Sequence, residues 1–381
     1  MDARTITRQI KTHAQRLGFA LVGITSADPA PHMNVYQRWL DTGRHGEMGY
    51  LARPDAVERR SNSHKILPEC KSILVLAVPY SNPSIAEKPD NGQAYGRVAA
   101  YAWGDDYHEV LKERLQALVA FIEELVGHPV PNRWHTDSGP LLERELAQRA
   151  GLGWIGKNTM LINPGRGSYF LLAEILLGIQ LEPDAPIVTD HCGTCTRCIE
   201  ACPTKCILPD RTLDASRCIS YLTIELKGPI EHELRPLMQD WVFGCDICQV
   251  VCPWNERFAH SHGDPAFAPR AQKAWVDLEA ELQINAQQFN EKLKGSPVRR
   301  AKRRGYLRNL AIAASNAALK SSLPALARVL LGEKEPLARG HAAWALGQIG
   351  GEEAISVLGM AEAREKDSWV LAEIKAALKT N

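Results

Sequence analysis

HCGTCTRCIEACPTKC, residues 191–206, decides how the middle of this chain folds. Cys192, Cys195, Cys198 and Cys202 follow the spacing C-x2-C-x2-C-x3-C-P. In that motif one short loop wraps three thiolates around an iron–sulfur cubane, and the fourth cysteine ligates a neighbouring cluster. A zinc site instead gathers two separate CxxC pairs around one ion. The spacing therefore predicts one 4Fe–4S cluster with a second one close by.

A second run, GCDICQVVCP (244–253), carries the same motif without its first cysteine. If the last cysteine of this second run ligates the cluster held by the first run, the ligands of the first cluster are Cys192, Cys195, Cys198 and Cys252. The second cluster then has three ligands and needs one more, for which Cys218 in DASRCISYL is the best candidate left. The predicted ligands of the second cluster are thus Cys202, Cys218, Cys245 and Cys248. Two such clusters form a relay for single electrons, often at low potential.

The composition predicts a globular protein of two or three domains. The chain has 381 residues, 45% apolar and 23% charged, with a formal net charge of +1. No apolar run reaches the ~18 residues of a membrane span, and the N-terminus lacks a signal core. We therefore expect a cytoplasmic protein, in which clustered cysteines are ligands rather than disulfides. Cys70, ahead of an apolar strand, is interpreted as a core residue, and Cys206 as a packed thiol.

The pattern of apolar residues divides the chain into four predicted regions. Residues 1–180 form an α/β or α+β domain, with helices near 4–17, 106–126 and 140–150 and strands near 19–24, 72–80 and 160–177. Residues 181–256 are cysteine-rich and form a small domain stabilised by clusters. Residues 257–297 form a connecting region with a weak helical pattern near 276–294.

Residues 298–381 show a loose repeat. RNLAIAASN (308–316) and RGHAAWALG (339–347) lie 31 residues apart, and each precedes a second apolar helical pattern. This pattern predicts two HEAT-like hairpins and a last helix near 367–379, with a plain helical bundle as the alternative.

Three short segments have competing interpretations. GLGWIGKN (151–158) resembles a nucleotide-binding loop, but helical sequence precedes it and extended sequence follows, so Gly151 is interpreted as a helix C-terminal glycine. In HTDSGPLLERELA (135–147), Asp137 or Ser138 either caps a helix or carries chemistry. The basic stretch 296–309 is either a solvated helix face or a contact for nucleic-acid phosphates, formed by Arg299, Arg300, Lys302, Arg303, Arg304 and Arg308.

The chain as a whole resembles the epoxyqueuosine reductase family, cobalamin-dependent iron–sulfur enzymes that complete queuosine in transfer RNA. The similar stretches, in chain order, are YAWGDDYH (101–108), HTDSGPLLERELAQRAGLGWIGKNTMLINPGRGSYFLLAEILL (135–177), CGTCTRCIEACPT (192–204), ASRCISYLTIE (215–225), FGCDICQVVCPWN (243–255) and RRGYLRNLAIAASN (303–316). The resemblance implies an α+β multidomain protein. Its parts are an α/β cobalamin-binding domain, a two-cluster ferredoxin-like module and C-terminal α-helical HEAT-like repeats that bind tRNA.

The resemblance also implies a reaction. Electrons from an external low-potential donor pass through the clusters to cob(II)alamin, and the reduced cobalt opens the epoxide of epoxyqueuosine at the wobble base. Asp137, in TDSGP, is the implied proton donor to the departing oxygen. The corrin ring is expected to meet Gly156, Lys157 and Asn158, with further candidates Arg60, Tyr101, Asp137, Ser168, Ser220, Tyr221 and Thr223.

The resemblance further implies how the substrate is held. The basic residues 299–308 would grip the anticodon arm of the tRNA by its phosphates. The cobalamin-binding signature D-x-H-x-x-G is absent, so no lower axial histidine from that motif is expected. We expect a monomer. The alternatives are a reductive dehalogenase-like cobalamin enzyme acting on a small molecule, and a non-catalytic electron-transfer protein.

Overall fold

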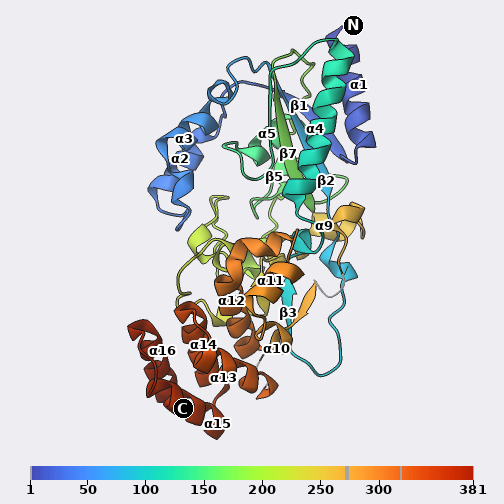
Figure 1. Cartoon of the computed structure of the whole chain (residues 1–381). Coiled ribbons are helices and arrows are strands. Elements are labelled where there is room, and N and C mark those ends of the chain that lie inside the picture. Colours follow the sequence, from blue (N-terminus) through green and yellow to red (C-terminus); the bar gives the residue numbers. More distant parts are fainter. Residues whose placement is uncertain (1, 271–273, 318–319, 381) are drawn as a thin grey trace. The chain divides into compact units, whose positions relative to one another are not determined.

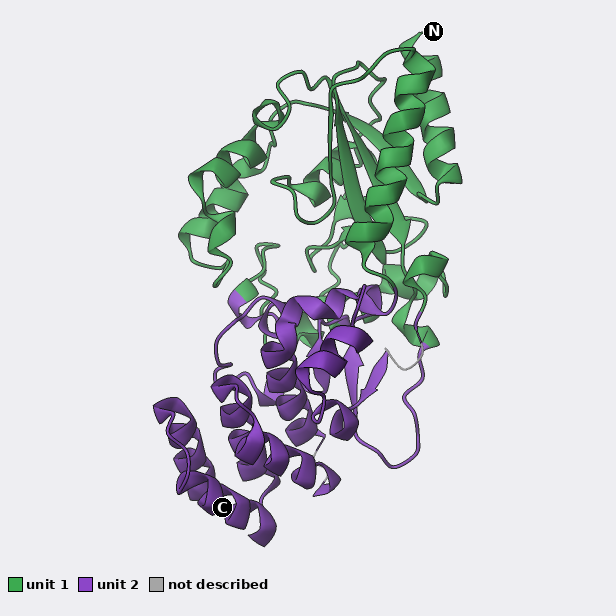
Figure 2. Cartoon of the chain, viewed as in Figure 1, with its two compact units in different colours: residues 1–85, 105–215, 247–268 green, residues 86–104, 216–246, 269–381 purple. Residues whose placement is uncertain are grey.

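The computed structural model describes residues 2–270, 274–317 and 320–380. The chain forms two compact units, each assembled from three separate stretches of sequence (Figure 2). Unit 1 comprises residues 1–85, 105–215 and 247–268, and unit 2 comprises residues 86–104, 216–246 and 269–381.

Unit 1 is built on a four-stranded antiparallel sheet in the order β1-β2-β7-β4 (Figure 1). Its strands are β1 (Leu21–Ser26), β2 (Ser72–Pro79), β4 (Asn132–His135) and β7 (Phe170–Leu177). The central strand β2 reads SILVLAVP and is buried from Ser72 to Val78. Such a continuous apolar run is typical of a strand that is covered on both faces.

Helices cover both faces of this sheet. Helix α5 (Glu143–Arg149) packs Leu146 and Ala147 against Ile73, Val75 and Ala77 of β2. Because side chains alternate along a strand, the intervening residues of β2 face the other way. Helices α1 (Ala3–Arg16) and α4 (Tyr107–Val126) contact each other on the sheet and lie side by side in Figure 1.

The remaining elements of unit 1 are short. They are α2 (Met33–Asp41), α3 (Pro54–Ser61), the hairpin of β5 (Trp154–Ile155) with β6 (Leu161–Ile162), α6 (Arg197–Ala201), α8 (Ile247–Val250) and α9 (Pro253–Phe258). The helices predicted near 4–17, 106–126 and 140–150 are all present, as is the strand predicted at 72–80. Strand β4 was not predicted, because its sequence NRWH is short and lacks apolar alternation.

Unit 2 has a small mixed sheet in the order β8-β3-β9. Strand β3 (Tyr95–Val98) pairs in parallel with β8 (Trp241–Phe243) and antiparallel with β9 (Trp275–Asp277). Helix α7 (Ile219–Ile224) also belongs to this unit. The weak helical pattern at 276–294 forms two short helices, α10 (Leu278–Glu281) and α11 (Ala286–Lys292). A new helix starts at Ala286 because Asn285 and Gln288 form a capping box.

The described residues of the C-terminal part of unit 2 form helices joined by turns. It contains α12 (Lys302–Asn316), α13 (Leu323–Gly332), α14 (Pro336–Ile349), α15 (Glu352–Glu362) and α16 (Ser368–Lys379) (Figure 1). Helix α14 contacts α12, α13, α15 and α16. It approaches α16 closely because Gly340 lies against the ring of Trp369, where an added Cβ would lie 2.3 Å away. The repeated small residues therefore serve helix packing, and the mixed α+β class with HEAT-like helices is confirmed.

No helix within residues 2–270, 274–317 and 320–380 combines the length and apolarity needed to cross a bilayer.

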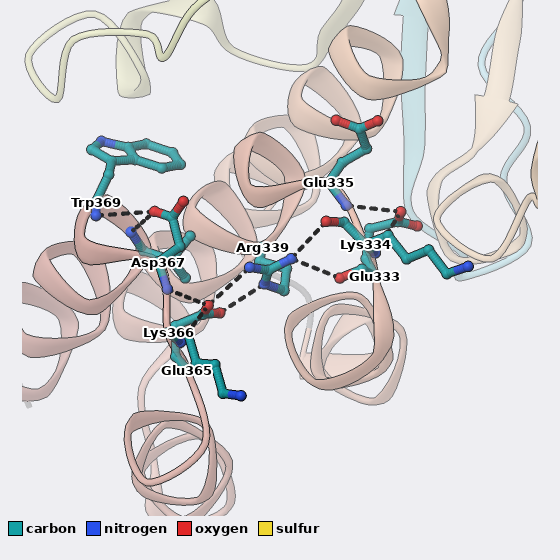
Figure 3. Close-up of polar contacts among 9 residues, drawn as sticks. Glu333, Lys334, Glu335, Arg339, Glu365, Lys366, Asp367 and Trp369 are labelled. Carbon is teal, nitrogen blue, oxygen red and sulfur yellow. Dashed lines mark hydrogen bonds and ion pairs between the residues drawn. The ribbon is translucent and has the colours of Figure 1, made fainter.

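One arginine joins two of the turns between the C-terminal helices (Figure 3). Arg339 donates from Nε and Nη2 to the carboxylate of Glu365, at 2.7 and 2.8 Å. Its Nη1 donates to the carbonyl oxygens of Glu333 and Lys334, both at 2.9 Å. Glu365 also accepts the backbone N–H groups of Lys366 and Asp367. The guanidinium therefore ties the α13–α14 turn to the α15–α16 turn.

Replacing Glu365 is expected to weaken unit 2 in a pH-dependent way. The bonds from Arg339, and then those from the backbone, lower the pKa of Glu365 to about 2. A carboxyl whose folded pKa lies below its unfolded value stabilises the fold above that unfolded value, about 4.3, and loses this effect as the pH falls towards 2. We expect Glu365→Gln to lower the free energy of unfolding by about 1–3 kcal/mol at pH 7 and by far less near pH 2. Urea denaturation at both pH values measures this, with the exposed Glu353→Gln as control. An equal loss of unfolding free energy at both pH values would contradict the lowered pKa of Glu365.

Candidate active site and cluster centre

Asp137 lies in the loop between β4 and α5, and two side chains from the first turn of α4 meet its carboxylate. The hydroxyl of Tyr107 donates to Oδ2 of Asp137 at 2.7 Å, and Nε2 of His108 lies 3.6 Å from the same oxygen. Helix α5 starts at Glu143 with Leu142 as its N-cap and has no side-chain cap. The helix-capping interpretation of Asp137 and Ser138 is therefore wrong.

The backbone of this loop is tightly constrained. Asp137 has φ of +56°, in the left-handed region that non-glycine residues rarely adopt. Its N–H donates to Oε1 of Glu143 at 2.6 Å. Gly139 packs against His135 so closely that an added Cβ would lie 2.5 Å from a ring carbon. These contacts turn the Asp137 side chain towards α4.

The surroundings of Asp137 combine one cationic group with two acids. Hydrogen bonds to Asp106 and then to Asp137 raise the pKa of His108 to about 9, so its imidazole is protonated near neutral pH. Burial, and next the charge of Asp137, raise the pKa of Glu143 to about 7. Burial raises the pKa of Glu174, in the middle of β7, well above its ordinary value, and the charges of Glu143 and Asp137 add to this effect. The Asp137 side chain itself is 46% exposed, so a ligand can reach it.

The four cysteines predicted to hold the first cluster line one cavity in unit 1. The cavity has a volume of about 280 Å³, and its walls include Cys192, Cys195, Cys198 and Cys252. Cys252 is the N-cap of α9, and the other three come from the loop that leads into α6 and from α6 itself. Four sulfur ligands around one space suit an iron–sulfur cubane.

The cysteines predicted for the second cluster are divided between the units. Cys202 and Cys248 belong to unit 1, and Cys218 and Cys245 belong to unit 2, so this ligand set stays a prediction. Sγ of Cys206 lies 3.4 Å from Sγ of Cys202, and this hydrogen bond is the main cause that lowers the pKa of Cys202 to about 5. A thiolate is the form that binds iron. Cys206 is buried, as a packed thiol would be, but its position also makes it a rival to Cys218.

Cys70 is a buried core residue, as predicted. Burial raises the pKa of its thiol to about 11, which suits an inert packed side chain.

The GWIGKN loop supports the first cysteine loop. Nζ of Lys157 donates to the carbonyl oxygens of Gly193 and Cys195, at 2.7 and 3.0 Å. Lys157 and Asn158 also line the four-cysteine cavity. Gly151, with φ of +76°, follows α5 as the predicted C-terminal glycine. A β-hairpin follows it instead of a helix, so this segment lacks the strand–loop–helix context of a nucleotide site.

The other predicted corrin contacts are scattered. Arg60, Gly156 and Ser168 belong to unit 1, and Tyr101, Ser220, Tyr221 and Thr223 belong to unit 2. Ser168 is buried and bonded to Asn255 and Gln249. Thr223 is fully buried; its hydroxyl donates within α7 and accepts the N–H of Gly244. Since protein groups occupy their hydroxyls, we keep Ser168 and Thr223 out of the proposed cofactor contacts.

The six basic residues of 299–308 have different surroundings. Arg299, Arg300, Lys302 and Arg304 are exposed, although Arg300 pairs with Glu225 at 2.8 Å. Arg303 is partly buried and pairs with Glu333. Arg308 is fully buried and donates to the carbonyl oxygens of Leu222, Leu226 and Gly228. It has no exposed surface for a phosphate, so we remove it from the predicted tRNA contacts.

Reasoning from sequence did not select Tyr107, His108, Glu143 or Glu174. Tyr107 and His108 lie in YAWGDDYH, and Glu143 and Glu174 lie in 135–177, so all four fall in stretches that carried the family resemblance. Nothing in their local spacing indicates that they approach Asp137.

Family models and curated relatives match most of this chain. A family model described as a 4Fe-4S double cluster binding domain matches residues 191–255. A model described as "Epoxyqueuosine reductase QueG, DUF1730" matches 60–138, and one for HEAT repeats matches 299–379. An epoxyqueuosine reductase from Pseudomonas aeruginosa is 40% identical over 356 residues, covering 92% of this chain and 96% of the relative.

Two solved structures are similar over almost the whole chain. A crystal structure of epoxyqueuosine reductase with a tRNA-Tyr epoxyqueuosine-modified stem loop has a TM-score of 0.90, 33% identity and coverage of 99% and 98%. An epoxyqueuosine reductase from Bacillus subtilis, with its aspartate catalytic loop swung out of the active site, has a TM-score of 0.89, 33% identity and coverage of 99% of both chains.

The double-cluster segment and the similarity to curated reductases define an iron–sulfur oxidoreductase that holds two 4Fe–4S clusters. Within that class, the chain belongs to the epoxyqueuosine reductase family, as its sequence indicated.

Proposed function

We propose that this protein reduces epoxyqueuosine to queuosine at the wobble position of transfer RNA, with Asp137 as the proton donor. Family membership supports the reaction, as does the related structure that holds an epoxyqueuosine-modified stem loop. The observation that carries the assignment of Asp137 is its half-exposed carboxylate, which Tyr107 and the cationic His108 hold in place.

The reaction needs two electrons and two protons. Both carbon–oxygen bonds of the epoxide break, a carbon–carbon double bond forms, and the oxygen leaves as water. The two clusters deliver the electrons singly, from an external low-potential donor. Asp137, which must be protonated before the chemical step, supplies one proton to the leaving oxygen, because an unprotonated alkoxide is a poor leaving group. The second proton comes from solvent. Tyr107 orients the carboxyl, and His108 stabilises negative charge left on Asp137 after the transfer.

Cobalamin, the cofactor that the resemblance implies, would supply low-valent cobalt as the direct reductant of the substrate. Protein groups hold the Asp137 carboxylate while 46% of its side chain stays exposed, so a group bound there could reach the acid. We propose Arg60, Tyr101, Gly156, Lys157, Asn158, Ser220 and Tyr221 as residues that would hold the corrin ring.

Each region predicted from the sequence is proposed to have its own role. Residues 1–180 are proposed to bind cobalamin, and residues 181–256 to carry the clusters. Residues 257–297 connect the cluster region to residues 298–381, which are proposed to bind the anticodon arm. We also propose that the protein is a monomer and is located in the cytoplasm. Anaerobic reconstitution with iron, sulfide and cobalamin, followed by assay on epoxyqueuosine tRNA, tests the function. Absence of queuosine from a fully loaded protein would refute it.

The exposed basic residues are expected to contact tRNA phosphates. Arg304→Ala should make the negative slope of log K against log salt less steep by about 0.7–0.9, because one fewer counterion is released on binding. Arg308→Met is the comparison, because it removes a buried charge that three carbonyl groups bind. That variant should lose thermal stability, and its folded fraction should keep the parental salt slope. Binding titrations over a series of salt concentrations measure both slopes. An unchanged slope for Arg304→Ala would remove this residue from the interface.

A further inference from the structure

An acid at the start of α5 binds the backbone of the loop that carries Asp137. The Asp137 N–H donates to Oε1 of Glu143 at 2.6 Å, six residues further along the chain. The left-handed φ of +56° costs roughly 1–2 kcal/mol for a residue with a Cβ, and such a conformation persists only when neighbouring groups impose it. Two hydrogen bonds act on the backbone here: the Asp137 N–H donates to Glu143, and the Ser138 N–H donates to the Thr136 carbonyl oxygen at 2.5 Å, which closes a tight turn around Asp137. The bond to Glu143 is the one that ties this turn to α5.

Other contacts hold different parts of the same loop. The Tyr107 hydroxyl fixes the carboxylate of Asp137 but leaves its backbone unconstrained. The close approach of Gly139 to His135 fixes the next turn of the chain. Without an acceptor for its N–H, Asp137 could relax to a negative φ, and its side chain would then turn away from Tyr107 and His108.

We propose that Glu143 is a positioning residue that acts as a latch, holding the catalytic loop in the conformation in which Asp137 meets Tyr107 and His108. The inference rests on the proposed role of Asp137. The Bacillus subtilis relative with its catalytic loop swung out of the active site provides an independent reason to look for a latch.

The charges around Glu143 make this latch sensitive to protonation near neutral pH. Glu143 faces Asp137 in the loop, His108 on α4, Arg144 on α5 and Glu174 on β7. Burial first, and then the charge of Asp137, raise the pKa of Glu143 to about 7, so a larger share of Glu143 is anionic at pH 8 than at pH 6. A carboxylate accepts an N–H more strongly than a neutral carboxyl group does. The latch is therefore tighter at pH 8 than at pH 6, a range in which His108 stays protonated.

Amide hydrogen exchange of the segment 136–142 tests the latch without cobalamin or substrate. It is measured on the cluster-loaded protein, after correction for intrinsic exchange rates. Glu143→Ala should exchange about tenfold faster than the parent at pH 8, as expected for loss of a bond to a charged acceptor. Glu143→Gln keeps an acceptor oxygen and should stay within a few-fold of the parent. Glu109→Ala, on the exposed side of α4, serves as control.

The pH dependence provides the second measurement. The parent should lose protection of 136–142 between pH 8 and pH 6, and Glu143→Gln should show no such change. Parental exchange in a folded Glu143→Ala would overturn the proposal. If that variant does not fold, a parental pH dependence in Glu143→Gln would overturn it instead.

Turnover measurements distinguish failure of the latch proposal from failure of the proposed function. Glu143→Ala should lower kcat with little change in KM, and Glu143→Gln should restore most of the loss. If Asp137→Asn retains parental turnover while Glu143→Ala still loosens the loop, then the role of Asp137 fails and the latch stands.

Discussion

Asp137→Asn is expected to lower the turnover of epoxyqueuosine in tRNA by about 10²–10⁴-fold. Asparagine keeps the shape of the side chain and can accept the hydrogen bond from Tyr107, but it has no proton to give to the leaving oxygen. Iron content, the visible spectrum of the clusters and the affinity for tRNA should remain those of the parent. Single-turnover assays with chemically reduced protein measure the chemical step without the electron donor.

The control for this variant is Glu109→Gln, which removes one negative charge from an exposed position on α4. It should turn over at the parental rate. Parental turnover by Asp137→Asn would show that another group protonates the oxygen. An equal loss in both variants would show that the effect is one of overall charge.

Cys218→Ala is expected to halve the iron content. Two 4Fe–4S clusters contain 2 × 4 = 8 irons, and loss of one ligand of the second cluster should leave about four. Cys206→Ala, the matched control, removes a thiol of the same size from the same half of the chain. It should retain about eight irons, because Cys206 is proposed to pack beside Cys202 and not to bind iron. Anaerobic iron and sulfide analysis, with electron paramagnetic resonance of the reduced protein, measures how many clusters each of the two variants retains.

The opposite result would reassign the fourth ligand of the second cluster. If Cys206→Ala loses four irons and Cys218→Ala keeps eight, then the thiol next to Cys202 is the ligand. A loss in both variants would mean that Cys206 is needed to assemble the cluster. Loss of all iron in Cys218→Ala would show that the two clusters assemble together.

Features set by neighbours in the chain could be predicted from the sequence. The cysteine spacing of 192–202 identified a cluster loop, since the reach of three short connections is a local property. The helices of the C-terminal repeats follow from the period of their apolar residues, and the buried strand β2 follows from its continuous apolar run. The order of the motifs along the chain was enough to identify the family.

Tertiary structure alone decided which polar residues carry chemistry and which support the fold. Arg304 and Arg308 belong to one basic run and lie near the same face of α12, four residues apart. Arg304 is nevertheless exposed and Arg308 buried, because the segment 222–228 packs against Arg308 and presents three carbonyl groups to it. Asp137 could have been a helix cap until Tyr107, 30 residues earlier in the chain, was found against its carboxylate and Glu143 against its N–H. Local spacing fixes secondary structure through short-range sterics and hydrogen bonds. The environment of a side chain depends on which distant segments pack beside it, and that information is spread over the whole sequence.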